Sequence, residues 1–133
     1  MRPFLHDAAV GHLRLIDRRQ GLLPVETMVD GLELPEGCVE VSSLAVAPEH
    51  LDGHPAMLMY RRAFHYSTDT GATHWACVLE QRLLDTLTDF FNFPFVVVGP
   101  EIEYAGTTVP AVVELQAVWD RVETGEVDSW FGR

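Results

Sequence analysis

The sequence contains no lysine. All nine basic residues are arginine, they stand against twenty acidic residues, and the formal net charge is −11. Without an ε-amine the chain cannot perform Schiff-base catalysis or build a phosphate-binding loop of the Walker type. It also lacks a basic stripe that could neutralise a phosphate backbone, so we expect no nucleic-acid partner.

Long apolar runs and cysteines are also scarce. The longest clean apolar run spans 93–98, far short of the roughly 20 residues that cross a bilayer, so we predict no transmembrane helix. Polar residues at 6–7 interrupt the N-terminal apolar segment, which argues against a signal peptide and favours the cytoplasm. Only Cys38 and Cys77 are present, and we expect them to be buried free thiols that define no metal site.

The remaining composition is that of one globular domain. Hydrophobic residues make up 47% and charged residues 22% of the 133 residues, values typical of a soluble domain with its own core. We therefore treat 1–133 as a single domain that ends in an acidic tail at about 123–133.

Hydrophobic periodicity predicts an α/β (α+β) order of elements. Strands are expected over 9–16, 39–46, 73–79, 95–98 and 108–115, and helices over 55–68, 80–92 and 115–122. A long loop over 20–37 is expected to hold one helical turn near 26–29. The strand, helix and strand over 39–79 predict a right-handed parallel crossover, and the last two strands predict an antiparallel pair.

Two positions predict a β-bulge. Gly11 lies near the start of the first strand, where glycine often marks one. In the second strand the alternation of apolar and polar residues shifts phase at Ser43, which is the pattern that an extra residue in a strand produces.

The aromatic residues leave two interpretations open. Those around the second helix fit a core, which we favour, or an acyl tunnel: Trp75, Phe90, Phe91 and Phe93. Those near the C-terminus fit a subunit contact or a cover over exposed core: Trp119, Trp130 and Phe131.

The segment after the long loop carries a resemblance. It reads Glu40-Val41-Ser42-Ser43-Leu44-Ala45-Val46 and continues through Pro48, His50 and Gly53 into a helix. This pattern resembles the GNAT acyltransferases, in which a bulged strand is splayed from its neighbour. In that fold the pantetheine arm of a thioester bonds to the exposed backbone, and amides at the helix start receive the pyrophosphate. The splayed pair would be 38–46 and 73–79.

Flanking motifs narrow the resemblance to one branch of that fold. Upstream lies Gly11-His12-Leu13-Arg14-Leu15, and downstream lies Gly99-Pro100-Glu101-Ile102-Glu103-Tyr104-Ala105-Gly106. Over about 9–116 the chain resembles the acyl-homoserine-lactone (autoinducer) synthases and the long-chain N-acyl amino acid synthases. The fold implied is a mixed central sheet with a βαβ core and a C-terminal antiparallel hairpin. About two helices and two strands come before the strand at 9–16 in that fold, so we expect the N-terminal strands and helices to be missing here.

The resemblance implies transfer of a fatty acyl group from acyl carrier protein or acyl-CoA to the amine of an amino-acid-like acceptor. Glu40 would accept the proton of the attacking amine. Arg14 would pair with Glu40 or bind an acceptor carboxylate, and Ser42 would orient the acceptor or the thioester. The residues that would hold the donor are Leu44, Ala45, Val46, His50, Gly53 and His54, with the backbone of 44–46 polarising the thioester carbonyl.

Each of these residues also has a plain structural interpretation. Glu40 could be a solvated acid on a strand, Arg14 part of a structural ion pair, and Ser42 strand filler. Ser43 stands where the family has arginine, and Asp52 in the phosphate loop would repel phosphate.

Two other functions and one assembly state therefore stay open. The alternatives are an acetyl-CoA N-acetyltransferase and a non-catalytic remnant of the GNAT fold that acts as an interaction module. A sheet without its N-terminal strands has an open edge, so we expect a homodimer or a partner chain.

Overall fold

The computed structural model describes residues 4–5, 8–9, 11–46, 54–103 and 106–133. Its elements are β1 (Phe4–Leu5), β2 (Ala8–Ala9), β3 (Gly11–Asp17), η1 (Arg18–Gln20), α1 (Pro24–Met28), β4 (Cys38–Val46), α2 (His54–Asp69), β5 (His74–Glu80), α3 (Gln81–Asp85), the π-turn η3 (Thr86–Phe90), β6 (Val96–Val97), β7 (Ile102–Glu103), β8 (Thr107–Glu114), α4 (Leu115–Thr124) and η4 (Ser129–Phe131). The α/β order expected from the sequence is confirmed.

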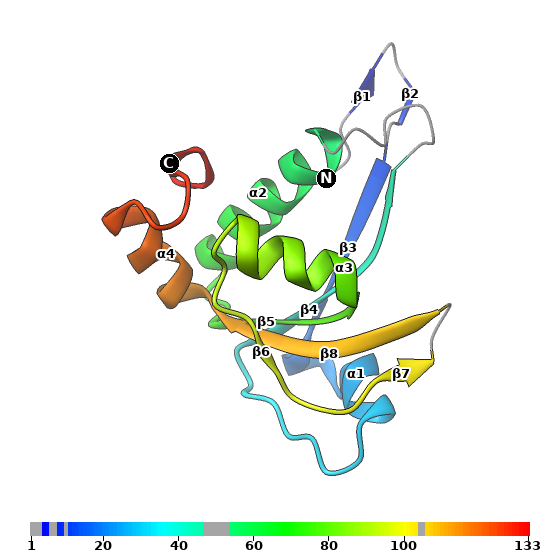
Figure 1. Ribbon diagram of the computed structural model, residues 1–133. Coiled ribbons are helices and arrows are strands. Elements are labelled where there is room, and N and C mark those ends of the chain that lie inside the picture. Colours follow the sequence, from blue (N-terminus) through cyan, green and yellow to red (C-terminus); the bar gives the residue numbers. More distant parts are fainter. Residues whose placement is uncertain (1–3, 6–7, 10, 47–53, 104–105) are drawn as a thin grey trace.

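A six-stranded mixed sheet organises the molecule (Figure 1). The strand order is β3-β4-β5-β8-β6, and β7 pairs with β8 beside β6. Strands β4 and β5 are parallel and are joined by α2, whereas β6 and β7 run antiparallel to β8. The expected βαβ core and C-terminal antiparallel pairing are both confirmed.

Two apolar layers cover the two faces of the sheet. Helices α2, α3 and α4 lie on one face, and α1 with its long connection lies on the other (Figure 1). Because side chains alternate along a strand, Val39 and Val41 of β4 pack in the larger core under α2, while Cys38 packs with α1 residues in the smaller core. We call these the α2 face and the α1 face.

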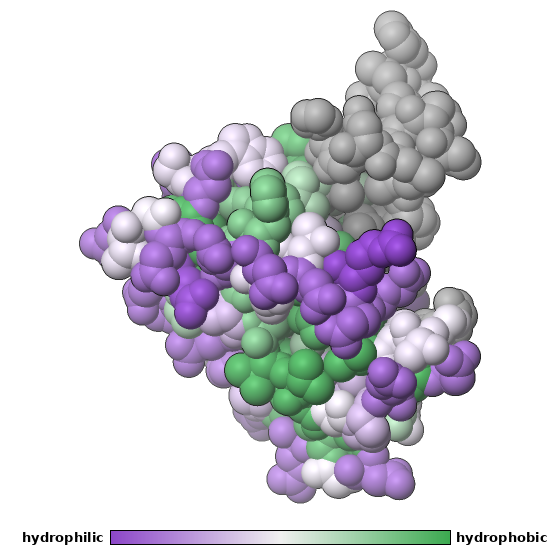
Figure 2. Space-filling view, in the orientation of Figure 1, coloured by the Kyte–Doolittle hydropathy of each residue, from purple (hydrophilic) through white to green (hydrophobic). Residues whose placement is uncertain are grey.

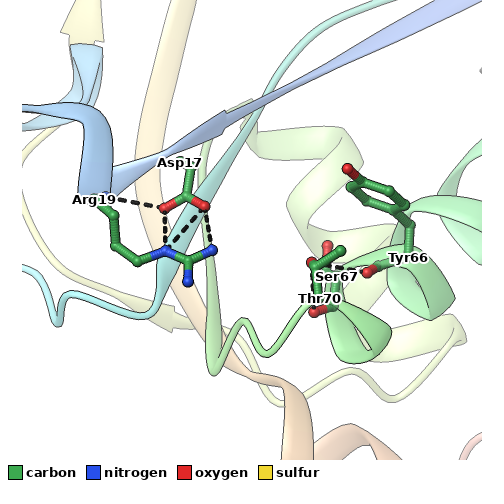
Figure 3. Close-up of polar contacts among 5 residues, drawn as sticks. All are labelled: Asp17, Arg19, Tyr66, Ser67 and Thr70. Atoms are coloured by element: carbon green, nitrogen blue, oxygen red, sulfur yellow. Dashed lines mark hydrogen bonds and ion pairs between the residues drawn. The ribbon is translucent and has the colours of Figure 1, made fainter.

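Local signals explain where β3 ends and α1 begins. Asp17 accepts a hydrogen bond from the Arg19 backbone N–H (2.9 Å) and pairs with the Arg19 guanidinium (Figure 3). Helix α1 starts at Pro24, whose missing N–H costs nothing at that position. The Glu26 carboxylate accepts a hydrogen bond from the Leu23 N–H (3.0 Å), which caps the first turn. The helical turn expected within the long loop is therefore confirmed.

The register between β3 and β4 contains a bulge. His12 lies opposite Ala45 and Arg14 lies opposite Ser42, so one residue of β3 faces two residues of β4, at 43–44. An extra residue of this kind bends the strand and increases its local twist. The phase shift at Ser43 in the sequence therefore located the bulge correctly.

Three local features differ from the expectations. The bulge predicted at Gly11 is wrong, because Gly11 lies opposite Val46 in unbroken register with the next pair. The helix predicted over 80–92 turns into a π-turn after Asp85 and ends at Phe90, with Asn92 in the left-handed region at φ 64°. Phe90 is 75% exposed, so it belongs neither to a core nor to a tunnel.

The other aromatic residues around the second helix belong to the core. Trp75 and Phe93 are buried in it, and Phe91 packs against it. The core interpretation is therefore confirmed for these three residues.

The C-terminal segment packs on the domain. Val127 and Phe131 are buried in the larger core, the Arg61 Nε–H donates to the Trp130 carbonyl (2.6 Å), and His65 Nε2 lies 2.7 Å from the Phe131 carbonyl. Phe131 thus covers core, one of the two roles foreseen for the terminal aromatic residues.

The cysteines and the helices can be compared with what the sequence predicts. Cys38 and Cys77 are buried free thiols, as expected. Within the described ranges, no helix has the length and apolar character that crossing a membrane requires.

Candidate functional site

The parallel strands β4 and β5 separate after three residue pairs. Their ladder joins Cys38 to His74 and ends with Glu40 opposite Ala76. Beyond that point β4 stays paired with β3, and β5 stays paired with β8 as far as Glu80. The sheet is therefore split between these two strands, and the splay expected between 38–46 and 73–79 is confirmed.

A cavity of about 510 Å³ lies where the strands separate. On the α2 face it is lined by Val41, Tyr60, Leu79 and Leu83, and on the α1 face by Arg14, Ile16, Pro24, Met28, Glu40, Ser42, Val78, Glu80 and Thr108. Because it draws side chains from both faces, the cavity is a slot through the sheet, and we call it the slot. It has the form required to hold an extended apolar ligand between two strands.

Glu40 is the buried carboxylate of the slot. Its side chain is on the α1 face, only 4% of the residue is exposed, and Oε1 accepts a hydrogen bond from the Val25 N–H (2.8 Å). Burial raises the pKa of Glu40 above its ordinary value, the bond from Val25 opposes that rise, and the nearby Glu26 carboxylate adds to it. The interpretation of Glu40 as a solvated acid is wrong, because the residue is only 4% exposed. A buried carboxylate with a raised pKa has the property that a proton acceptor needs.

An ion pair fixes the α1 segment that donates the hydrogen bond to Glu40. The Arg18 Nε lies 2.7 Å from Glu26 Oε1, and the Glu26 side chain is 3% exposed. The same Glu26 oxygen caps α1 at Leu23. The backbone amide that reaches Glu40 is thus fixed from two directions.

Arg14 and Ser42 complete the set of expected catalytic residues. They lie opposite each other on β3 and β4, and both line the slot with Glu40. Arg14 is exposed and forms no ion pair with Glu40, whose carboxylate contacts the α1 backbone instead. Of the two roles expected for Arg14, the pairing with Glu40 is therefore absent, and the binding of an acceptor carboxylate stays a prediction. The three residues nevertheless share one cavity.

Only part of the expected donor site falls within the described residues. Leu44, Ala45 and Val46 are in β4 along the splay, and His54 is the first residue of α2. His50 and Gly53 lie outside the described residues. In the part of the chain that the structure describes, no cluster of three His, Cys, Asp or Glu side chains could hold a metal ion.

The buried thiols do not supply a nucleophile. Burial, with the charges of Glu26 and Glu40, raises the pKa of Cys38 to about 12. Burial likewise raises the pKa of Cys77 well above its ordinary value. Both thiols stay protonated near neutral pH, and it is the thiolate that attacks.

Three polar residues of the slot were not predicted from the sequence: Tyr60, Glu80 and Thr108. Tyr60 lies on α2 among the apolar residues that pack on the sheet. The available signal was chemical, because a tyrosine within a buried face needs a partner for its hydroxyl.

A larger cavity, about 650 Å³, lies between α2 and β3. Its lining includes Arg61, His65 and Asp69, which hold the C-terminal segment. These side chains are engaged in packing that segment, so we place the candidate chemistry in the slot.

Comparisons with known proteins bear on the fold that carries the slot. No protein-family model matches the sequence, and no curated protein matches it significantly. Among solved structures, the CoA-dependent acyl-homoserine lactone synthase BjaI, determined with SAM and isopentyl-CoA, has a TM-score of 0.66 at 17% identity, over 92% of this chain and 63% of its own. The CoA-dependent synthase MesI has a TM-score of 0.71 at 15% identity, over 94% of this chain and 67% of its own. A GNAT-family acetyltransferase from Streptococcus pneumoniae has a TM-score of 0.55 at 12% identity, over 84% of this chain and 62% of its own.

These similarities establish the fold. The chain has the GNAT-like fold that acyl-homoserine lactone synthases and GNAT acetyltransferases share. It spans about 63–67% of the length of the two synthases.

Proposed function

We propose that this chain is an acyltransferase domain that moves a fatty acyl group from a pantetheine thioester, carried by CoA or acyl carrier protein, to the amine of an amino-acid-like acceptor. The observation that carries this proposal is the slot between β4 and β5 with the buried carboxylate of Glu40 on its wall. The shared fold with acyl-homoserine lactone synthases supports it.

In the proposed reaction Glu40 handles the proton. The amine nitrogen attacks the thioester carbonyl carbon, the C–N bond forms, and the C–S bond breaks as the thiolate leaves with its electron pair. The proton lost by the amine passes to the Glu40 carboxylate, directly or through one water. The backbone amides of 44–46, along the splayed part of β4, are the proposed donors that polarise the carbonyl.

The acceptor is proposed to bind at Arg14 and Ser42. Arg14 carries a planar guanidinium, which matches a carboxylate as a two-pronged donor. Arg14 is exposed and lines the same cavity as Glu40. An acceptor whose carboxylate binds Arg14 could therefore present its amine toward Glu40. This arrangement favours an amino-acid-like acceptor.

The slot favours a fatty acyl group over acetyl. The slot has a volume of about 510 Å³ and an apolar lining that includes Ile16, Met28 and Leu83. Both the volume and the apolar surface are larger than an acetyl group can fill. The structural similarity is also greater to the synthases, with TM-scores of 0.66 and 0.71, than to the acetyltransferase at 0.55. An acetyl-specific enzyme would leave most of this apolar surface unfilled.

We also propose a cytoplasmic protein whose outer β3 edge is covered by a second copy or by a partner chain. The buried free thiols fit a reducing compartment. Among the described strands, none pairs with the outer edge of β3, and an open edge exposes backbone groups that readily recruit another strand.

Thiol release from a series of acyl-CoA donors tests the proposed function. With a mixture of amino acids as acceptors, we expect acceptor-dependent release of CoA thiol that is faster with octanoyl-CoA than with acetyl-CoA. A preference for acetyl-CoA would favour the acetyltransferase alternative. Absence of acceptor-dependent release with every donor, CoA-borne and carrier-borne, would favour the non-catalytic alternative.

A further inference from the structure

Tyr60 is a largely buried tyrosine of the slot whose hydroxyl has no hydrogen-bond partner among the described residues. The residue is 4% exposed, and its ring lies 6.4 Å from that of Trp75, centre to centre. The hydroxyl is not one of the described polar atoms that are both fully enclosed and unpaired. Because Tyr60 lines the slot, its hydroxyl is available there to pair with a ligand.

Neighbouring aromatic side chains show that this core otherwise satisfies its polar atoms. The Trp75 indole N–H donates to Ser67 Oγ (2.9 Å), and the Trp119 indole N–H donates to Thr68 Oγ1 (2.8 Å). Both acceptors lie on α2, the helix that carries Tyr60. Tyr60 therefore differs from these two neighbours, because its polar atom is left available to the slot.

Tyr60 lies on the face of the slot opposite to Glu40. It lines the cavity from the α2 face, while Glu40 lines it from the α1 face. A ligand that passes between β4 and β5 therefore has a proton acceptor on one side and a hydroxyl on the other.

The hydroxyl acts as a donor. Burial raises the pKa of Tyr60 above its ordinary value, and Cys77 adds to the rise, so the phenol keeps its proton near neutral pH. An acyl thioester has one strong acceptor between its apolar chain and its pantetheine arm, namely the carbonyl oxygen. That oxygen gains negative charge when an amine attacks, so a hydrogen bond there is strongest in the transition state.

We propose that the Tyr60 hydroxyl donates a hydrogen bond to the thioester carbonyl oxygen of the acyl donor bound in the slot. This inference rests on the proposed function and adds a catalytic residue on the face opposite Glu40. In the free protein the hydroxyl has no partner among the described residues, and the thioester carbonyl of the bound donor supplies one.

The test combines one variant with two ligands. Tyr60→Phe removes the hydroxyl and keeps the ring, and S-octyl-CoA is a thioether that lacks the carbonyl of octanoyl-CoA. By titration calorimetry we expect Tyr60→Phe to raise the Kd for octanoyl-CoA about five- to tenfold, the effect of one lost hydrogen bond, and to leave the Kd for S-octyl-CoA unchanged. Because the variant removes a hydroxyl that bonds to no described residue, its melting temperature without ligand should equal or exceed that of the wild type.

Tyr66→Phe is the matched control. Tyr66 lies on the same helix but is 61% exposed, with its ring standing clear of the Thr70 and Ser67 contacts (Figure 3). We expect both Kd values and the melting temperature of this variant to match the wild type.

Several results would overturn the assignment of Tyr60. Equal weakening of both ligands by Tyr60→Phe would place the contact away from the carbonyl, and a lower melting temperature would show that the hydroxyl is paired in the free protein. If the wild type binds both ligands and Tyr60→Phe binds them equally well, the Tyr60 role fails and the proposed function stands. If the wild type binds neither ligand, the CoA-dependent function and the Tyr60 role fail together.

Discussion

Glu40 is a buried carboxylate with one hydrogen-bond donor among the described residues. It is 4% exposed, and its described partner is one backbone N–H, that of Val25. A second buried carboxylate, Glu26, lies close enough to raise its pKa further. A charged carboxylate in this position costs free energy, which makes it a better proton acceptor than a solvated one.

Replacing Glu40 with glutamine tests its role in turnover. Glu40→Gln keeps the shape and an acceptor for the Val25 N–H but cannot take up a proton at neutral pH. We expect kcat to fall by about 10² or more, the size of a lost general base, while the Kd for octanoyl-CoA changes little. The wild-type rate should rise with pH through the raised pKa of Glu40, and a rate that is flat across the accessible pH range would remove Glu40 from the mechanism.

The same substitution predicts a change in the pH dependence of stability. Between the ordinary pKa of 4.5 and the raised pKa of the folded protein, the folded state keeps a proton on Glu40 that the unfolded chain has released. The free energy of unfolding should therefore fall as pH rises through the folded pKa. Glu40→Gln cannot titrate, so urea unfolding at a series of pH values should show the variant gaining stability over the wild type across this window. Parallel curves for the two proteins would show that the pKa of Glu40 is ordinary.

Among the helices and strands, the short helix α1 is the element that positions Glu40. It places the Val25 N–H on Glu40, and Arg18 and Leu23 both contact the buried carboxylate of Glu26. Five residues cannot form a stable helix alone, so α1 depends on these contacts and on its apolar packing.

Arg18→Ala tests this support. It leaves a buried carboxylate without its cation, and we expect a loss of about 2 kcal/mol in the free energy of unfolding together with slower turnover. The neighbouring Arg19→Ala is the control, because the pair between Arg19 and Asp17 lies on the surface (Figure 3) and such pairs contribute little. Equal effects of the two variants would show that the contact of Arg18 with Glu26 does not hold α1.

The features that the sequence predicted are those set by local patterns. The bulge at 43–44 followed from a break in alternation, and α2 followed from apolar spacing after a proline. The grouping of Glu40, Ser42 and Arg14 followed from a family resemblance. The π-turn after Asp85 and the pairing of Glu40 with Val25 did not follow, because each depends on packing between segments distant in sequence. The hydroxyl of Tyr60 on an apolar helix face was a signal in the sequence, but only the packing of α2 on the sheet places it in the slot.

At the scale of the whole molecule, both ends of the sheet present surface for association. The outer edge of β3 has no partner among the described strands. At the other end Val96 and Val97 of β6 are 63% and 53% exposed, and Figure 2 shows apolar side chains gathered around that strand. Copies that each carry a formal charge of −11 repel one another, so association should strengthen as salt screens the charge.

Light scattering at low micromolar concentration tests the assembly. We expect a dimer whose fraction increases with salt, and a melting temperature that rises with protein concentration. Val97→Glu tests the β6 end of the sheet: this variant should stay dimeric if the β3 edge forms the contact, with near-ultraviolet circular dichroism to confirm that it is folded. A monomer with a sharp melting transition at every concentration would contradict the dimer.

Amide hydrogen exchange with and without octanoyl-CoA tests most directly whether an acyl thioester binds in the slot. The ladder between β4 and β5 ends at Glu40 and Ala76, so the amides beyond that point are those that a pantetheine arm would cover. We expect octanoyl-CoA to slow exchange over 41–46, over 77–80 and at the start of α2. Protection confined to the segment 99–115, with the two splayed strands unchanged, would contradict the account.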